Sequence, residues 1–343
     1  MELHRGLPLP TANRPTALAI GNFDGVHRGH QALIDALKAH AQPRDLACAV
    51  MTFEPHPREY FAKLSGDPSK APLRISTLRD RLDALASHGV DTTFLLRFGK
   101  SLASMSAEDF VHTLLVKACR ARFVMVGEDF RFGARRMGDV ALIKAMGAQF
   151  GFGVATLSDV KENGQRISST MVRSALAGGD MAQAAELLGR PYAISGHVLH
   201  GAKLGRTLDF PTLNLRVPFI NPAARGIFVA RVHGLGPQPL PGVASLGLRP
   251  TVDAATQQKQ GRWLLETHLF DWQGDAYGKL VRVELLKKLR DEEKYVDLAT
   301  LKDAIAGDAA AARKHFGIAP DTATLQQIPA KEIVRISTSS VSA

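Results

Sequence analysis

The stretch GNFDGVHRGH at residues 21–30 combines the side chains and glycines that nucleotide chemistry needs. It follows an apolar run and precedes an amphipathic pattern, so it lies at a predicted junction of strand and helix. His27 and His30 are three residues apart at the start of that helix, so both rings can lie on one side of it. Gly25 and Gly29 let the backbone approach a phosphate, and a helix N-terminus offers free N–H groups to an anion. The stretch contains no activated nucleophile, so it predicts stabilisation of charge on a reacting phosphate rather than covalent catalysis.

The elements around this stretch predict a parallel sheet covered by helices. Short apolar runs alternate with helical patterns from residue 16 to about residue 160. The predicted strands cover residues 16–21, 45–53, 92–98, 122–127 and 153–160, and the predicted helices cover residues 30–41, 78–89, 107–118 and 140–151. In such sheets ligands bind beyond the carboxyl ends of the strands, which is where GNFDGVHRGH falls.

The pattern changes to strands and turns from residue 192. Two short helical patterns at 168–192, broken by Gly178 and Gly179, come before the change. Six predicted strands with no helix between them indicate a closed antiparallel β-barrel, followed by a helix at 297–316. The six strands cover residues 192–201, 212–217, 226–234, 241–248, 263–270 and 279–289. We therefore expect a Rossmann-like α/β domain over 1–188, a barrel domain with a terminal helix over 189–318 and a tail over 319–343.

The composition is that of an ordinary globular protein, with 45% hydrophobic and 22% charged residues. The N-terminus lacks the apolar run of a signal peptide, and no stretch approaches a membrane span, so we expect a cytoplasmic protein. Cys48 and Cys119 lie in apolar surroundings and are expected to be buried and unpaired. Residues 1–190 and 191–343 each carry half of the net charge of +10, so no basic tail or stripe indicates a nucleic-acid partner.

The first motif resembles the GxFDxxHxGH signature of the nucleotidyltransferase superfamily. TFEPHP (52–57), GEDFRFG (127–133) and ISSTMVR (167–173) resemble the bacterial FMN adenylyltransferase module. The resemblance implies that His27, His30 and Arg173 are catalytic, and that the remaining ATP and flavin contacts come from Gly21, Phe23, Asp24, Gly25, His56, Asp129, Ser168, Ser169 and Thr170. A Ser/Thr run that opens a helix is also a good N-cap, so a purely structural role for the serines stays open.

GAKLGRTLDFPTLNL at 201–215 resembles the riboflavin kinase signature, whose core is usually G-x-P-T-A-N. WLLETHLFDW at 263–272 fits the same family, and Glu266 matches its catalytic base. Thr212 and Asn214 are two apart in a strand and point to one face, so they are expected to bind Mg²⁺. Leu213 replaces the usual alanine, and Asp209 replaces the usual glycine. The other expected ATP and flavin contacts are Gly201, Lys203, Gly205, Arg206 and Pro211.

The order of the two resemblances is that of the bifunctional prokaryotic riboflavin kinase/FMN adenylyltransferase family. Membership implies ATP, riboflavin, FMN and FAD as substrates and products, Mg²⁺ in both halves, and a monomer or weak homo-oligomer with no membrane or nucleic-acid partner. Two alternatives stay open. One is that only one half is active, with the carboxylate of Asp209 impairing the kinase; the other is a flavin- or RNA-binding regulator on the same scaffold.

Overall fold

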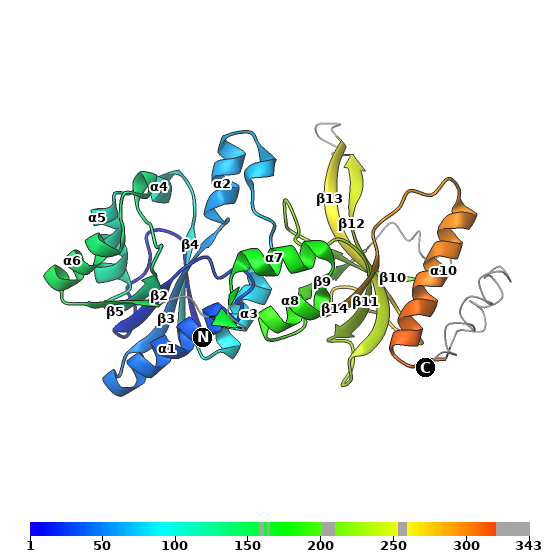
Figure 1. Ribbon diagram of the computed structural model, residues 1–343, viewed down its shortest axis with the longest axis horizontal. Helices are drawn as coiled ribbons and strands as arrows, with labels where there is room; N and C mark the ends of the chain where they lie inside the picture. Colours follow the sequence, from blue (N-terminus) through cyan, green and yellow to red (C-terminus); the bar gives the residue numbers. More distant parts are fainter. Residues whose placement is uncertain (158–160, 163–164, 201–209, 253–258, 320–343) are drawn as a thin grey trace. The chain divides into compact units, whose positions relative to one another are not determined.

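The computed structural model describes residues 1–157, 161–162, 165–200, 210–252 and 259–319, which belong to two compact units (Figure 1). The sheet unit contains Met1–Arg173 and Leu187–Gly189, and the barrel unit contains Ser174–Glu186 and the residues from Arg190 on. Among the described helices, none is both long and apolar enough to cross a membrane.

The sheet unit is built on a parallel six-stranded sheet with the order β1-β4-β3-β2-β5-β6. Its strands are β1 (Glu2–Arg5), β2 (Thr16–Ile20), β3 (Ala47–Glu54), β4 (Thr92–Arg97), β5 (Ala121–Gly127) and β6 (Gly153–Leu157), and a separate hairpin pairs β7 (Lys161–Glu162) with β8 (Gln165–Arg166). The chain leaves β2 towards β3 on one side and later returns to β5 on the other. This reversal makes the carboxyl end of β2 the point where such sheets bind ligands.

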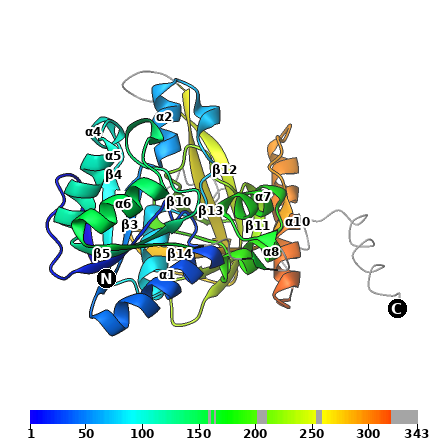
Figure 2. The ribbon, with the colours of Figure 1, turned by 60° about the vertical axis from the view of Figure 1, so that its left-hand side comes forward.

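Helices cover both faces of the sheet, and all five residues of β2 are buried, so that the strand packs on both of its sides. Ala17 and Ala19 pack with α1 and α3, whereas Leu18 and Ile20 pack with η3 and α6, and Figure 2 shows α1 and α6 on opposite faces. The helices that lie wholly in this unit are α1 (Arg28–Ala41), η1 (Gln42–Arg44), α2 (Pro57–Leu64), η2 (Pro68–Lys70), α3 (Leu78–Ser87), α4 (Lys100–Ala103), α5 (Ala107–Asp109), η3 (Phe110–Ala118), η4 (Ala134–Arg136) and α6 (Val140–Phe150). Two further helices, α7 (Ser169–Gly178) and α8 (Met181–Leu188), each have residues in both units.

The helix predicted over 107–118 is only partly an α-helix. One short α turn, α5, passes into the π-helix η3, which ends where the N–H of Cys119 donates to the carbonyl of Leu114 at 2.8 Å. The wider turn of the π-helix keeps Phe110, Val111 and Leu115 in the core. Tertiary packing therefore accounts for a π-helix here, because the apolar pattern alone does not distinguish it from an α-helix. Elsewhere the pattern predicted the described elements to within a few residues, although β1, α2, α4, the β7–β8 hairpin and the short turns η1, η2 and η4 were not expected; residues 158–160 of the strand predicted at 153–160 lie outside the described ranges.

The barrel unit contains a closed antiparallel barrel with the order β10-β13-β12-β11-β14-β9. Its strands are β9 (Ala193–Leu199), β10 (Thr212–Arg216), β11 (Gly226–His233), β12 (Leu240–Val252), β13 (Lys259–Leu269) and β14 (Leu280–Arg290), and closure comes from the pairing of β9 with both β10 and β14. The expected six-stranded barrel with a terminal helix is thereby confirmed.

The terminal helix α10 (Leu298–His315) packs against the barrel through small side chains. Ala306, Ala309 and Ala312 contact an apolar cluster that includes Ile227 and Val229 of β11. Two further clamps hold the helix. Arg290 donates to Asp308 at 2.9 and 2.6 Å, and Arg313 donates to Asp271 at 3.0 and 2.7 Å.

Candidate active sites

The loop after β2 is strained. Phe23, Gly25 and Val26 have φ angles of 49°, 84° and 44°, and a positive φ is a clear outlier for a β-branched valine. Glycine is required at 25, because a Cβ there would lie 2.7 Å from Cγ2 of Ile75. Gly21 starts the loop by donating its N–H to the carbonyl of Met51 at 3.1 Å. Strain held in this way by its surroundings is typical of a ligand-binding loop.

Asp24 is a buried hydrogen-bond acceptor at the centre of this loop. The N–H groups of Ile75 and Ser76 donate to its carboxylate at 3.2 and 3.1 Å, the Ser76 hydroxyl donates at 3.1 Å, and Nη2 of Arg173 donates at 2.9 Å. Burial alone would raise the pKa of Asp24, but Arg74, Arg173 and the two N–H groups outweigh it and lower the pKa below its usual value. Asp24 is therefore ionised at neutral pH and holds Arg173 beside the loop.

His27 and His30 lie ring on ring, with centroids 3.7 Å apart and planes 19° from parallel. His27 is the N-cap of α1, and its Nδ1 accepts the backbone N–H of His30 at 3.4 Å. Its neutral ring therefore carries a proton on Nε2. Burial, with help from His27 and Arg173, lowers the pKa of His30 well below its usual value. Both the stacking and the burial favour a neutral His30, whose Nδ1 is buried without a hydrogen-bond partner among the described residues.

His56 and Asp129 follow the neighbouring strands β3 and β5. His56 is buried at the N-cap of α2, where its Nδ1 accepts the N–H of Arg58 at 3.1 Å. Burial is the main reason that the pKa of His56 falls to about 3, so this ring is neutral. Asp129 is exposed on the loop that leaves β5. Both residues thus lie at carboxyl ends of the sheet, where the topology predicts ligand binding.

The serine and threonine run lies at the start of α7. The hydroxyl of Ser168 accepts the N–H of Met171 at 3.4 Å, and Ser169 and Thr170 are the first residues of the helix. Arg173 lies one turn further on, and its Nε donates to the carbonyl of Leu73 at 2.7 Å. The capping role that the sequence left open for Ser168 is therefore present, and it leaves the other free N–H groups of the helix start available to an anion.

Two buried arginines near the loop after β2 were missed by sequence reasoning. Arg74 is 3% exposed and lies 2.6 Å from Glu59, 3.2 Å from Glu54 and 3.8 Å from Asp24. Arg81 has no solvent exposure and also pairs with Glu54. No pattern in the sequence identifies them, since arginines in amphipathic segments are mostly exposed. The carboxylate of Asp24 thus has buried positive charge beside it from inside the unit.

A group of aromatic side chains at the carboxyl ends of β3 and β4 was also missed. Phe98 lies with its ring centroid 6.1 Å from that of Phe53, 5.6 Å from that of Tyr60 and 5.8 Å from that of Phe61. Phe61 is 50% exposed, which is unusual for so large an apolar ring. The phenylalanines are visible in FEPHPREYF and RFG, but only the parallel pairing of β3 with β4 brings them together.

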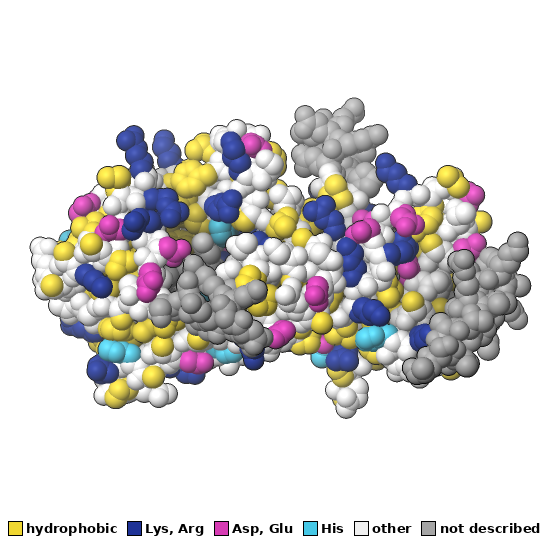
Figure 3. Space-filling view, viewed as in Figure 1, with side chains coloured by type: hydrophobic (Ala, Val, Ile, Leu, Met, Phe, Trp, Pro, Cys, Tyr) yellow, Lys and Arg dark blue, Asp and Glu magenta, His cyan; other side chains and the backbone are white. Residues whose placement is uncertain are grey.

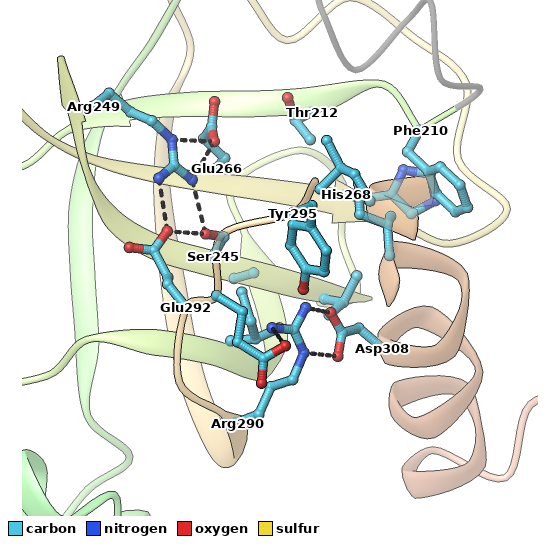
Figure 4. Close-up of a pocket in the computed structure, with 16 residues that line it drawn as sticks. Phe210, Thr212, Ser245, Arg249, Glu266, His268, Arg290, Glu292, Tyr295 and Asp308 are labelled. Atoms are coloured by element: carbon cyan, nitrogen blue, oxygen red, sulfur yellow. Dashed lines mark hydrogen bonds and ion pairs between the residues drawn. The ribbon is translucent and has the colours of Figure 1, made fainter. Parts of the chain in front are cut away.

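The barrel unit holds a cavity of about 330 Å³ (Figure 4). Strands β10, β12 and β13 line one side of it. Its lining includes Phe210, Thr212, Ser245, Glu266 and His268. A concave site of this size, mostly apolar with a few convergent polar groups, is the usual form of a small-molecule site.

The register of the barrel explains why these polar groups meet. Asn214 lies directly opposite Glu266 across β10 and β13, and Ser245 lies opposite Glu266 on the other side, across β12 and β13. Thr212 in turn lies opposite His268. Residues paired in this way point to the same face of a sheet. The structure thus brings Thr212, Asn214 and Glu266 together, as sequence reasoning expected, and adds Ser245 and His268.

Thr212 and Asn214 suit a cation that arrives with phosphate. The amide nitrogen of Asn214 donates to the carbonyl of Thr212 at 3.3 Å, while the amide oxygen and the Thr212 hydroxyl accept no hydrogen bond from the described residues. Mg²⁺ favours oxygen ligands and keeps several sites for water and phosphate. In the described part of the chain, no three His, Cys, Asp or Glu side chains form a metal-binding group.

Four of the predicted contacts fall on residues that lie outside the described ranges: Gly201, Lys203, Gly205 and Arg206, and the same holds for Asp209. Pro211 is described and exposed, and its carbonyl oxygen lies 3.0 Å from Nδ1 of His268. Across the described part of the face seen in Figure 3, Lys and Arg side chains are dispersed among Asp and Glu side chains. This matches the even division of charge in the sequence.

Comparisons with known proteins match both halves of the chain. The family profile for FAD synthetase matches residues 9–171, and the profile for riboflavin kinase matches residues 188–316. The bifunctional riboflavin kinase/FMN adenylyltransferase of Escherichia coli (strain K12) is 46% identical over 301 residues, which cover 88% of this chain and 93% of the relative. The protein of the same description from Haemophilus influenzae is 40% identical over 320 residues, covering 92% and 99%.

A solved structure also resembles the chain along most of its length. The crystal structure described as a macrolide-efflux protein from Streptococcus pneumoniae matches with a TM-score of 0.67 and 29% sequence identity, covering 87% of this chain and 94% of that one. The two family profiles occur here in the order expected from the sequence, each on its own unit. The chain therefore belongs to the family of bifunctional riboflavin kinases/FMN adenylyltransferases.

Proposed function

We propose that the chain phosphorylates riboflavin to FMN in the barrel unit and adenylylates FMN to FAD in the sheet unit, using ATP in both steps. The observation that carries the residue roles is the cavity that contains Glu266 and Thr212, with Asn214 directly opposite Glu266 in the barrel. A carboxylate beside two neutral oxygen ligands suits a general base next to a phosphate-bound cation.

In the kinase step, Glu266 takes the proton of the ribityl 5′-hydroxyl, whose oxygen bonds to the γ-phosphorus of ATP while ADP leaves. Mg²⁺ enters as part of the MgATP substrate, where it neutralises phosphate charge, and Thr212 and Asn214 would hold it. The carboxyl proton then passes to water. The proposed roles of Gly201, Lys203, Gly205, Arg206 and Pro211 around ATP and flavin follow from the resemblance.

In the adenylyltransferase step, a phosphate oxygen of FMN bonds to the α-phosphorus of a second ATP, and pyrophosphate leaves. The neutral rings of His27 and His30 donate hydrogen bonds to the reacting phosphate, and Arg173 supplies positive charge beside it. The start of α7, with Ser168, Ser169 and Thr170, receives the other phosphates. Gly21, Phe23, Asp24, Gly25, His56 and Asp129 complete the proposed ATP and flavin contacts, with Mg²⁺ again supplied by MgATP.

The aromatic group around Phe98 is proposed to receive the isoalloxazine ring. Phe61 offers a half-exposed face, and Tyr60 and Phe98 support it by edge contacts. A flat heteroaromatic ring gains from stacking on such a surface. Changing Phe61 to alanine is expected to raise the KM for FMN without changing the kinase step.

The test is to incubate the full chain with riboflavin, ATP and Mg²⁺ and to resolve the flavins by chromatography over time. FMN should appear first and FAD should follow. Glu266→Gln should slow FMN formation by about 10²–10⁴-fold while supplied FMN is still converted to FAD, and His30→Ala should have the opposite effect. Equal kinase rates for Glu266→Gln and the unmodified chain would refute the role of Glu266.

The remaining expectations stay predictions: the domain limits at residues 188 and 318, a cytoplasmic location, a monomer or weak homo-oligomer, and the lack of a nucleic-acid partner. Sedimentation of the purified chain with and without RNA tests the last two together. A single slow species that RNA does not shift is the expected result.

A further inference from the structure

Arg249 lies between two carboxylates at the edge of the cavity (Figure 4). Its Nε and Nη2 donate to Glu266 at 3.0 and 2.8 Å, and its Nη1 donates to Glu292 at 2.7 Å. The guanidinium comes from β12, Glu266 from β13, and Glu292 from the connection between β14 and α10. Three separate parts of the barrel unit thus converge on the proposed base.

The two hydrogen bonds to Glu266 end on the same oxygen. Both Nε and Nη2 of Arg249 donate to Oε2, and Oε1 accepts no hydrogen bond from the described residues. A side-by-side Arg–carboxylate pair would occupy both oxygens. Here one oxygen is held and the other is left for a substrate, which is the arrangement that a general base needs.

Arg249 is itself fixed on its far side. Nη2 also donates to the hydroxyl of Ser245 at 3.0 Å, and that hydroxyl donates to Oε1 of Glu292 at 3.1 Å. Gly247 lies beneath this contact, because a Cβ at that position would overlap the Glu292 carboxylate. The close approach of Glu292 to β12 therefore depends on a glycine at position 247. Because Glu292 accepts a hydrogen bond from Arg249, the orientation of the Arg249 guanidinium depends on the same glycine.

We infer that Arg249, oriented by Glu292 and Ser245, is a positioning residue of the kinase step that fixes Oε2 of Glu266 and so presents Oε1 to the ribityl 5′-hydroxyl. This inference rests on the proposed role of Glu266 as the base. An unrestrained carboxylate rotates about its last torsion, and the planar fork of arginine prevents this where a lysine would not. In the reaction the proton moves to Oε1, the hydroxyl oxygen bonds to phosphorus, and ADP leaves with the electrons of the broken P–O bond.

A second cluster in the same barrel provides a matched control. Glu284 is buried on β14 and is contacted by Arg231 at 3.7 Å and by Arg282 at 3.5 Å, and none of the three lines the cavity. Arg282→Ala removes an arginine of similar exposure from a carboxylate with no proposed role in the reaction. If Arg249→Ala lowered the kinase rate only because it removes an ion pair from the barrel surface, Arg282→Ala would lower the rate as well.

The experiment compares Arg249→Ala, Arg249→Lys, Gly247→Ala, Arg282→Ala and Glu266→Gln in the full chain. Arg249→Ala should lower the kcat for FMN formation by about 100-fold, the usual cost of misplacing a reacting group by about 1 Å, with a KM for riboflavin within twofold of the unmodified value. Added methylguanidine should restore part of that rate. Arg249→Lys and Gly247→Ala should lose about tenfold each, because the charge stays but its orientation is lost. Arg282→Ala should be unchanged.

The outcomes separate the inference from the proposal beneath it. Full activity of Glu266→Gln would overturn the base and the positioning role together. An inactive Glu266→Gln with a normal kcat for Arg249→Ala would overturn the positioning role alone, as would a rise in KM at constant kcat. Tryptophan fluorescence monitors folding of the barrel unit. If Arg249→Ala does not fold, a normal kcat for the folded Gly247→Ala variant overturns the inference.

Discussion

Arg81 is a residue whose removal has a calculable effect on one unit only. Its side chain has no solvent exposure, and Nη1 donates to the carbonyls of Asn22 at 2.9 Å and Phe53 at 3.2 Å, while Nη2 pairs with Glu54. The arginine thereby joins the loop after β2 to the end of β3. Arg81→Met keeps the length of the side chain and removes the charge and every one of these hydrogen bonds.

The expected cost is about 2–3 kcal/mol in the free energy of unfolding. Removing one partner of a buried ion pair usually costs about 3–5 kcal/mol. Two features reduce this figure here. Glu54 keeps Arg74 at 3.2 Å, and the Nε of Arg81, which is buried without a hydrogen-bond partner among the described residues, is no longer left unpaired. For a unit of this size, the loss corresponds to a fall of about 5–10 °C in Tm.

The two tryptophans make the assay specific. Trp263 and Trp272 both lie in the barrel unit, so their fluorescence reports on that unit, whereas thermal loss of FMN adenylyltransferase activity reports on the sheet unit. Arg81→Met should lower the midpoint of activity loss and leave the fluorescence midpoint unchanged. Arg79→Met, two residues away on the exposed side of α3, is the control and should change neither.

A shift of less than about 1 °C in the activity midpoint would refute this reasoning, because the buried ion pair would then add no more stability than the methionine side chain that replaces it. An equal shift in both midpoints would refute the assumption that the effect is confined to one unit.

Three further predictions concern single residues. The pKa of His56 is lowered because the folded sheet unit disfavours the protonated ring, so this residue causes a loss of stability that begins as the pH falls through about 6.5. His56→Asn keeps an N-cap acceptor and should reduce this loss, as measured in thermal melts between pH 7 and pH 5. Cys48 and Cys119 are buried and unpaired, and burial raises the pKa of Cys48 to about 12, so neither thiol should react with iodoacetamide until the chain is denatured, as counted by mass spectrometry. Gly307 is exposed inside α10 with open space around its Cα, so Gly307→Ala should stabilise the barrel unit by about 0.5–1 kcal/mol, measured as a later fluorescence midpoint in urea.

Much of the fold could be predicted because the apolar runs are long enough to define their period. The strand β2 carries apolar residues on both sides, Ala17 and Ala19 on one and Leu18 and Ile20 on the other, as expected of a central parallel strand. Short elements escaped prediction. The strand β1 has four residues and owes its existence to pairing with β4, about 90 residues further on, which no local pattern contains.

The candidate sites were predictable where their residues form a contiguous motif. His27 and His30 are three apart in the chain, and Thr212 and Asn214 are two apart, so their proximity follows from local geometry. Arg249 and Glu292 could not be predicted as partners of Glu266. Their meeting depends on the register of β12 against β13 and on the path of the chain before α10, both of which are set by tertiary packing.

Closure of the barrel bears on how the chain associates with itself when it is concentrated or refolded. Each barrel strand has a neighbour on both sides over its central part, which leaves no backbone there for a further strand, whereas Gly247–Val252 of β12 and Lys259–Arg262 of β13 pair only with each other among the described strands. The open sheet ends at β1 and β6, and strands of four and five residues leave little backbone for a neighbouring molecule to pair with. Among the described strands, edge pairing between molecules is therefore limited to the short edges of the sheet unit and to this outer pair of β12 and β13, and a lysine or proline placed in β1 would suppress it at one of these edges.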